Sequence, residues 1–132
     1  KSDAIENLQK EYQILDLGTS SEESVDFQKY GIALGEAIKN KKADLGIAIC
    51  GTGIGISIAV NKVKGVMCAK ISNIEEAKLA KEHNNATVIA LSGKTSTEEA
   101  LKMIKIFLTS TPNKEEKYQR RINQIIEYEN AN

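Results

Sequence analysis

The segment GIAICGTGIGISIAVNKVKG, residues 46–65, places a thiol directly before the most glycine-rich part of the sequence. Cys50 ends an apolar run, and Gly51, Gly53 and Gly55 follow at alternate positions. A thiol at the N-terminus of a helix has a lowered pKa and can act as a nucleophile or a general base. Glycines let the backbone approach a ligand, and free N–H groups at a helix start bind anions. The segment therefore predicts an anion-binding pocket beside a reactive sulfur.

The residues around Cys50 limit which ligands the predicted anion-binding pocket can take. Thr52 and Ser57 add hydroxyl donors to the backbone amides. The dinucleotide-binding fingerprint requires a glycine where Ile56 stands, and a P-loop requires a lysine after its last glycine. Both nucleotide motifs are therefore excluded. The alternative interpretation is a tight strand-to-helix turn with a buried structural cysteine.

A second candidate group is the His-Asn pair in KEHNNA. His83 follows a predicted helix, and an imidazole that is neutral near pH 7 suits proton transfer. Asn84 is expected to form the turn after the helix. Cys68 lies within the apolar segment VMCAK and is expected to fill the core.

Several basic residues are candidate partners of a phosphate group. Lys117 and Arg121 are four residues apart in KYQRRINQIIEY, so they share one face of a helix. Lys94 follows a predicted strand in SGKTS, and Asp26 lies in the loop after the first predicted strand, where it would line the pocket. The alternative for the cations is an ordinary solvated helix face.

The composition excludes several classes of protein. The 132 residues carry 18 basic and 18 acidic side chains, so no basic excess points to nucleic acid. No apolar stretch approaches the roughly 20 residues of a membrane span, and no signal peptide is visible. Two cysteines in apolar runs fit a reducing cytoplasm, and no clustered ligands predict a metal site.

The periodicity predicts the elements that must hold these residues. Strands are expected at 12–17, 45–50, 66–69 and 88–91, and helices at 3–10, 28–40, 55–62, 74–83, 97–108 and 113–129. Ser72 or Asn73 is expected to cap the fourth helix. Alternating strands and helices predict one α/β domain, residues 1–132, in which a parallel sheet has helices on both faces. Ligands of such sheets bind at the carboxyl ends of the strands, where Cys50 is expected.

Four segments together resemble one known family. DLGTSSEESVDF, GIAICGTGIGISIAVNKVKGV, AKLAKEHNNATVIALSGK and YQRRI are similar in register to the ribose-5-phosphate isomerase B (RpiB/LacAB) sugar-phosphate isomerases, from Tyr12 to Ile125. The resemblance implies a Rossmann-like three-layer α/β/α sandwich that interconverts aldose and ketose phosphates without a metal or organic cofactor. It also implies a homodimer, or a dimer of dimers, with a shared active site and with the helix at 113–130 at the interface.

The resemblance assigns roles to individual residues. It implies that Cys50 is the base that moves a proton between C1 and C2 of the sugar. Thr52 and the amides from Gly51 to Ser57 would hold the enediolate oxygens. His83, supplied by the partner subunit, would open the sugar ring, and Asn84 would orient the substrate.

Some positions depart from the family pattern. The phosphate would bind Lys117, Arg121 and Lys94, but arginine is usual at the two lysine positions, and lysine lacks the bidentate fork. Phe27 replaces a tyrosine, and Tyr118 stands where histidine is common. Family members also open with a strand that ends in an Asp-His pair, so we expect the chain to begin beyond that strand and its pocket to be incomplete.

Two other activities remain open from the sequence. A subunit of a galactose-6-phosphate isomerase, or an allose-6-phosphate isomerase, belongs to the same class as a ribose-5-phosphate isomerase. The co-occurrence of Cys50, Thr52 and His83 in one chain favours a self-sufficient homodimer over a pair of unlike chains. A non-catalytic module that binds sugar phosphates is the alternative from a different class.

Overall fold

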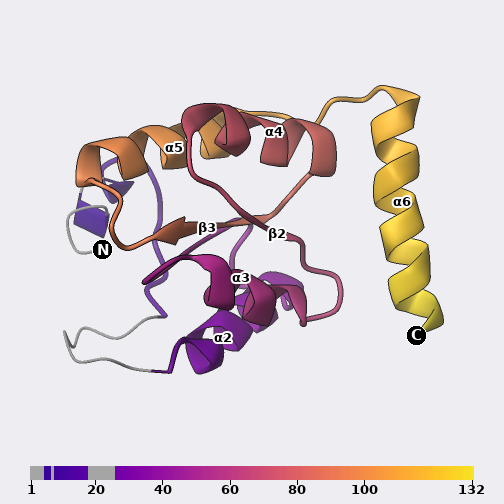
Figure 1. Ribbon diagram of the computed structural model, residues 1–132, viewed down its shortest axis with the longest axis horizontal. Helices are drawn as coiled ribbons and strands as arrows, with labels where there is room; N and C mark the ends of the chain where they lie inside the picture. The colour runs from indigo at the N-terminus through magenta and orange to yellow at the C-terminus, as the bar shows by residue number, and fades with distance from the viewer. Residues whose placement is uncertain (1–4, 7, 18–25) are drawn as a thin grey trace.

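The structure is a computed structural model and describes residues 5, 6, 8–17 and 26–132. Strands β1 (Gly46–Cys50), β2 (Cys68–Lys70) and β3 (Val88–Ser92) form a parallel sheet in the order β1-β3-β2. Figure 1 shows helices on both faces of this sheet, α2 and α3 on one side and α4 and α5 on the other. The bounds of these helices are Phe27–Lys39 for α2, Ile54–Asn61 for α3, Ile74–Asn84 for α4 and Thr97–Thr109 for α5. The predicted three-layer α/β/α sandwich is therefore confirmed.

The central strand β3 shows why the fold has two apolar layers. Successive side chains of a strand point to opposite faces of the sheet. Val88 and Ala90 accordingly pack in the core beneath α2 and α3, whereas Ile89 and Leu91 pack in the core beneath α4 and α5. All four side chains are fully buried. A continuous apolar run thus marks a strand that is covered on both faces.

Local capping groups set the ends of the helices that flank β3. Asn73 rather than Ser72 caps α4, because its Oδ1 accepts a hydrogen bond from the Glu76 amide at 2.8 Å. Asn85 ends the same helix in the left-handed conformation, with φ of +46°. The Ser96 hydroxyl caps α5 by accepting from the Glu99 amide at 3.2 Å.

The prediction of a fourth strand at 12–17 is wrong for the structure as described. These residues form no strand, and β1 pairs only with β3 among the described residues. Ile14 packs against the core beneath α4 and α5, but Leu15 is 53% exposed. Alternating side chains suit a strand, yet a strand also needs a neighbouring backbone to bond, and the sequence pattern of this segment does not reveal whether one is present.

Helix α6 (Glu116–Ala131) stands apart from the sandwich at the C-terminal end of the chain, as Figure 1 shows. It begins three residues later than predicted. Ile122 is its one buried side chain, while Ile125 is 50% and Tyr128 is 73% exposed. Near its end, Glu129 accepts a hydrogen bond from the Gly65 amide at 2.7 Å, which fastens the helix to the turn after α3.

The side chain of Asn61, at the end of α3, bonds the backbone of Cys68 in β2. Asn61 Nδ2 donates to the Cys68 carbonyl at 2.9 Å, and the Cys68 amide donates to Asn61 Oδ1 at 2.7 Å. The carbonyl of Met67, the residue before Cys68, accepts hydrogen bonds from the backbone amides of residues 87 and 88. Because the chain at the start of β2 bonds β3 through Met67, the amide and carbonyl of Cys68 face away from β3.

Candidate active site

The loop between β1 and α3 surrounds the thiol of Cys50. The Gly53 amide donates a hydrogen bond to Cys50 Sγ at 3.2 Å. Gly53 has φ of +80°, and a Cβ there would lie 2.9 Å from the carbonyl carbon of Leu91. Glycine is therefore required at position 53 both by the left-handed backbone and by the close approach to β3. The thiol that the sequence singled out lies at the carboxyl edge of the sheet, as predicted.

The two hydroxyl residues of the loop are used differently. Thr52 is exposed, and its Oγ1 accepts a hydrogen bond from the Ile54 amide at 3.1 Å, at the start of α3. Ser57 is only 8% exposed, and its hydroxyl donates to the Ile54 carbonyl at 2.6 Å. The structure therefore directs the Ser57 hydroxyl into its own helix, whereas Thr52 faces the solvent beside the thiol.

The start of α2 reaches the same loop. A Cβ on Gly55 would overlap the ring of Phe27, so this ring lies directly against the glycine backbone. Asp26 immediately precedes Phe27 and caps α2 without a side-chain hydrogen bond to the helix. Phe27 therefore connects the start of α2, where Asp26 lies, with Gly55, and the sequence predicted both Asp26 and Gly55 as ligand-binding residues.

The end of β3 forms the other wall of the loop. Cys50 lies opposite Ser92 in the sheet, and the Gly93 amide donates to the Cys50 carbonyl at 2.7 Å. Ser92 Oγ donates to the Gly51 carbonyl at 2.8 Å and accepts from the Lys94 amide at 3.1 Å. The sequence analysis missed Ser92. Its position directly after an apolar strand was the available signal, since strand ends line ligand sites in such sheets.

The remaining candidates gather at the junction of α4 and α6. The imidazole of His83 stacks on the ring of Tyr118, with centroids 4.3 Å apart and an interplanar angle of 11°. The Asn113 amide donates to the Glu82 carbonyl at 2.8 Å, which holds the start of α6 against the end of α4. The exposed Asn84 is the last residue of α4. The structure therefore brings His83 and Asn84 next to the N-terminal turns of α6.

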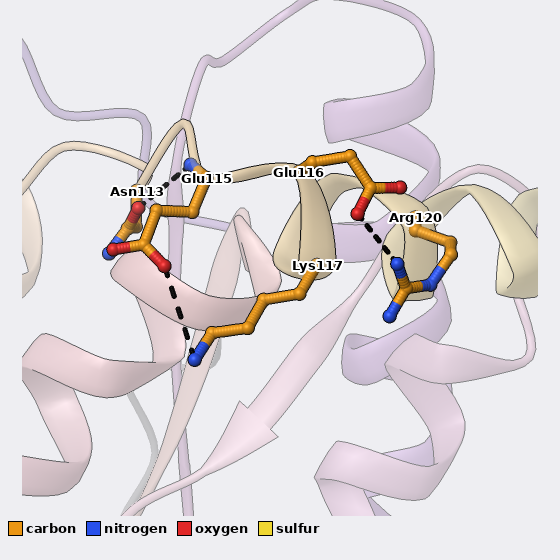
Figure 2. A network of polar contacts seen from close by, with 5 residues as sticks. All are labelled: Asn113, Glu115, Glu116, Lys117 and Arg120. Atoms are coloured by element: carbon orange, nitrogen blue, oxygen red, sulfur yellow. Dashed lines mark hydrogen bonds and ion pairs between the residues drawn. The ribbon is translucent and has the colours of Figure 1, made fainter.

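Acidic and basic side chains form ion pairs at the start of α6. Figure 2 shows the Lys117 ammonium directed toward Glu115 and the Arg120 guanidinium directed toward Glu116. The Lys117–Glu115 distance is 4.0 Å, and the Arg120–Glu116 distance is 2.6 Å. Arg121 is exposed and makes no ion pair with any residue that the structure describes. Of these three cations on α6, Arg121 is thus the one without an ion pair in the described part of the chain.

Lys81 supports the turn that carries the His-Asn pair. Its side chain is 8% exposed, its Nζ donates to the Ala86 carbonyl at 3.3 Å, and it lies 5.1 Å from the centroid of the Phe107 ring. Burial lowers the pKa of the Lys81 ammonium. The bond spans His83 and Asn84, so it closes the turn around them. A lysine on the apolar stripe of α4 was a signal that the sequence analysis did not use.

Cys68 behaves as a structural residue. Burial raises the pKa of its thiol from 9.0 to about 12, so the group stays protonated at neutral pH. The sulfur packs against the core beneath α2 and α3. Among the described residues, no three His, Cys, Asp or Glu side chains are grouped to hold a metal ion. In the same part of the chain, no helix is long and apolar enough to span a bilayer.

The two groups of candidates lie at opposite ends of the sheet within one chain. Cys50 is at the carboxyl edge, opposite Ser92, the last residue of β3. His83 lies in the last turn of α4, the helix that precedes β3, at the other edge of the sheet. The five residues of β3 separate these edges, a rise of about 13 Å. Within one chain, the thiol and the imidazole therefore lie at opposite edges of the sheet.

Comparison with known proteins adds the identity of the family. Residues 1–125 match the LacAB_rpiB family model, described as Ribose/Galactose Isomerase. The probable ribose-5-phosphate isomerase B of Mycoplasma genitalium is 38% identical over 123 residues, which cover 91% of this chain and 80% of the relative. The galactose-6-phosphate isomerase subunit LacB of Clostridium acetobutylicum is 40% identical over 85 residues, 64% of this chain and 49% of the relative.

The fold agrees with a solved structure in detail. The crystal structure of ribose-5-phosphate isomerase B from Mycoplasma genitalium with bound ribulose-5-phosphate superposes with a TM-score of 0.92 at 36% sequence identity. The match covers 100% of this chain and 89% of that chain. Sequence and structure thus agree that the chain belongs to the ribose/galactose isomerase (LacAB_rpiB) family.

Proposed function

We propose that the protein interconverts ribose 5-phosphate and ribulose 5-phosphate through an enediolate, with Cys50 as the base. The observation that carries this proposal is the convergence of the Cys50 sulfur and the loop amides at the carboxyl edge of the sheet. Relatives named as ribose-5-phosphate isomerase B, one of them with bound ribulose-5-phosphate, support the choice of sugar. The two free cysteines fit a reducing compartment, so we assign the enzyme to the cytoplasm.

The reaction requires a proton to leave one carbon and arrive at the next. The Cys50 thiolate takes the proton from C2 of the open-chain aldose, and the electron pair forms the C1–C2 double bond as O1 becomes negative. The thiol then returns the proton to C1, while the proton of the C2 hydroxyl passes to O1 and a carbonyl forms at C2. Backbone donors aimed at the developing oxyanion contribute about 3 kcal/mol each. The exposed loop after Cys50 offers such donors, and this chemistry requires no cofactor.

A second copy of the chain would complete the site. His83 acts on the ring oxygen of the closed sugar in this proposal, but its own chain holds it about 13 Å from the edge where Cys50 lies. A homodimer that places one copy's α4–α6 junction over the other copy's glycine loop brings the two groups together. The exposed apolar side chains of α6 support its place in that interface: Ile125, Ile126 and Tyr128. A dimer of such dimers is compatible with the same contact.

The phosphate group is assigned to basic residues on both sides of that interface. Lys94 follows β3 beside the glycine loop, whereas Lys117 and Arg121 lie on α6 beside His83. Of the two candidates on α6, Lys117 pairs with Glu115 whereas Arg121 pairs with no described residue, so Arg121 is the principal phosphate ligand on that helix. Binding of the phosphate at a distance from the reacting carbons positions C1 and C2 against the Cys50 thiol. Asp26 and Asn84 bind the sugar hydroxyls that lie between the phosphate and these carbons.

The proposal is tested by turnover and binding of ribose 5-phosphate. We expect Cys50→Ala to lower kcat about a thousandfold and to change the Kd for ribose 5-phosphate less than about threefold. The matched control is Cys68→Ala, which removes the other thiol and should keep kcat within about twofold. Wild-type protein that binds ribose 5-phosphate without isomerising it would instead support a non-catalytic sugar-phosphate module. Retention of kcat in Cys50→Ala would refute the base role.

The second candidate is a galactose-6-phosphate isomerase subunit, favoured by the similarity to LacB. The two activities are separated by the ratio of kcat/KM for ribose 5-phosphate and galactose 6-phosphate. An allose 6-phosphate substrate belongs in the same comparison. We expect the five-carbon substrate to give the higher kcat/KM, and a preference for a six-carbon phosphate would overturn this assignment.

A further inference from the structure

The end of β3 holds the glycine loop through three separate contacts. The Gly93 amide donates to the Cys50 carbonyl, and Gly53 packs against the Leu91–Ser92 peptide with no room for a Cβ. Between these two contacts, Ser92 Oγ donates to the Gly51 carbonyl at 2.8 Å. The first two contacts fix the residues on either side of the Gly51–Thr52 peptide, and the third fixes the peptide itself.

Among the described residues, the Ser92 hydroxyl is the one hydrogen-bond partner of the Gly51–Thr52 peptide groups, while the Thr52 side chain accepts from the Ile54 amide. A Cβ on Gly51 would meet nothing within 4 Å, so the backbone there is open on the side that a side chain would occupy. Glycine also adopts a wider range of backbone angles than any other residue. Steric contacts at Gly51 therefore do not select one orientation of the peptide plane, and the hydroxyl of Ser92 is the group that holds its carbonyl.

The hydrogen bond that orients the Gly51 carbonyl also sets the direction of the Thr52 amide. In a trans peptide the C=O and N–H bonds point in opposite directions. With the Gly51 carbonyl directed at Ser92, the Thr52 N–H points away from β3. Of the described residues, none accepts a hydrogen bond from this amide. The N–H is thus an unused donor two residues after Cys50, in the loop whose Gly53 amide bonds the sulfur.

We propose that Ser92 is a positioning residue that fixes the Gly51–Thr52 peptide so that the Thr52 amide donates to the enediolate oxygen. This inference deepens the proposed isomerase reaction and rests on it. Ser92 is itself held, because its Oγ accepts from the Lys94 amide at 3.1 Å. The turn that carries Lys94 therefore also orients the Thr52 amide, the donor to the oxyanion. Binding of the phosphate at Lys94 is thereby coupled to the position of the reacting carbons.

The inference predicts a loss of rate rather than of ground-state binding. An oxyanion donor interacts more strongly with the enediolate than with the substrate carbonyl. In Ser92→Ala the peptide regains its freedom, and we expect kcat to fall about tenfold to a hundredfold while KM changes less than about threefold. Ser92→Thr keeps the hydroxyl and should retain most of the wild-type kcat.

An analogue of the intermediate separates positioning from simple stabilisation. A phosphorylated hydroxamate with the geometry of the enediolate should lose affinity for Ser92→Ala by the same factor as kcat/KM falls, whereas ribose 5-phosphate should not. The matched control is Ser96→Ala, which removes the hydroxyl that caps α5. It should lower the melting temperature but leave both kcat and the hydroxamate affinity within about twofold.

The outcomes distinguish this inference from the proposal on which it rests. If the wild-type enzyme isomerises ribose 5-phosphate but Ser92→Ala keeps its kcat and its hydroxamate affinity, the positioning role is overturned and the proposed function stands. The positioning role is likewise overturned if Ser92→Ala loses only thermal stability, as Ser96→Ala should. A wild-type protein without isomerase activity would overturn both.

Discussion

The ring of Tyr118 lies parallel to the imidazole of His83, with centroids 4.3 Å apart. The contact joins the first turn of α6 to the last turn of α4, at the opposite end of α6 from the Glu129–Gly65 hydrogen bond. Lys117 Nζ lies 5.0 Å from the centroid of the same tyrosine ring. A residue proposed for ring opening and one proposed for phosphate binding therefore share a single aromatic support.

This stack predicts that position 118 needs an aromatic ring more than a hydroxyl. We expect Tyr118→Phe to keep kcat on ribose 5-phosphate within about twofold. Tyr118→Leu removes a contact worth about 1 kcal/mol and frees the imidazole, so kcat should fall about fivefold to tenfold. The comparison substrate is a four-carbon aldose phosphate that cannot close a furanose ring. Its turnover should change less than that of ribose 5-phosphate, and equal losses on both would contradict a role through His83.

The opposite positions of Cys50 and His83 predict complementation between inactive chains. A hybrid dimer of Cys50→Ala and His83→Ala, purified through two different tags, contains one intact shared site and should have about half of the wild-type activity. The control is a hybrid of wild type with the Cys50→Ala/His83→Ala double variant, in which every shared site lacks one group. It should be nearly inactive. Activity in this control, and none in the first hybrid, would show that each chain carries its own site.

The two thiols should differ in reactivity with an alkylating agent. Burial raises the pKa of Cys68 to about 12, so this group remains a thiol at pH 8, and iodoacetamide should modify Cys50 at least about tenfold faster. Peptide mass spectrometry after a timed reaction measures both rates. Preferential modification of Cys68 in the folded protein would contradict the burial that the structure shows.

The same shift gives the fold a dependence on alkaline pH. Below pH 9 the Cys68 thiol is protonated in both the folded and the unfolded chain, and its contribution is constant. Between pH 9 and about 12 the unfolded chain releases this proton while the folded chain keeps it, so the free energy of unfolding falls as pH rises. Urea unfolding across this range should show the slope, and Cys68→Ala should reduce it. An unchanged slope in the variant would assign the effect to other groups.

The close approach of Phe27 to Gly55 predicts a coupled effect on stability. A methyl group at position 55 would overlap the ring, so Gly55→Ala should lower the free energy of unfolding by about 1–3 kcal/mol. A double-mutant cycle with Phe27→Leu should recover part of this loss. Gly51→Ala is the matched control, since a Cβ there meets nothing within 4 Å and should cost little. Additive effects of the two substitutions would argue against the contact.

The sequence predicted the parts of the fold whose residues repeat with a clear period. The apolar run that became β3 and the stripe of α5 were assigned correctly because burial on fixed faces leaves a regular pattern. The glycine loop was also predictable, since few structures require a thiol and three glycines at that spacing. Tyr12 to Leu17 has the alternation of a strand, but strand formation depends on a neighbour that local sequence does not encode.

Relationships between distant residues were not predictable in the same way. The bond from Ser92 to the Gly51 carbonyl depends on the register of β1 and β3, which no local pattern specifies. The stack of His83 on Tyr118 depends on where α6 comes to lie, because the two residues are 35 positions apart in the chain. The division of the candidate residues between two ends of the sheet follows from the direction of α4, so it required the arrangement of the elements.

The amide of Asn61 has a consequence for how copies of this chain associate. By bonding the outward backbone groups of Cys68, it occupies the hydrogen-bonding positions that an incoming strand would use. Growth of the sheet across β2 into a neighbouring molecule is thereby blocked at that point, which protects the protein from edge-to-edge aggregation. Along this edge of the described sheet, another strand would first have to displace the Asn61 side chain.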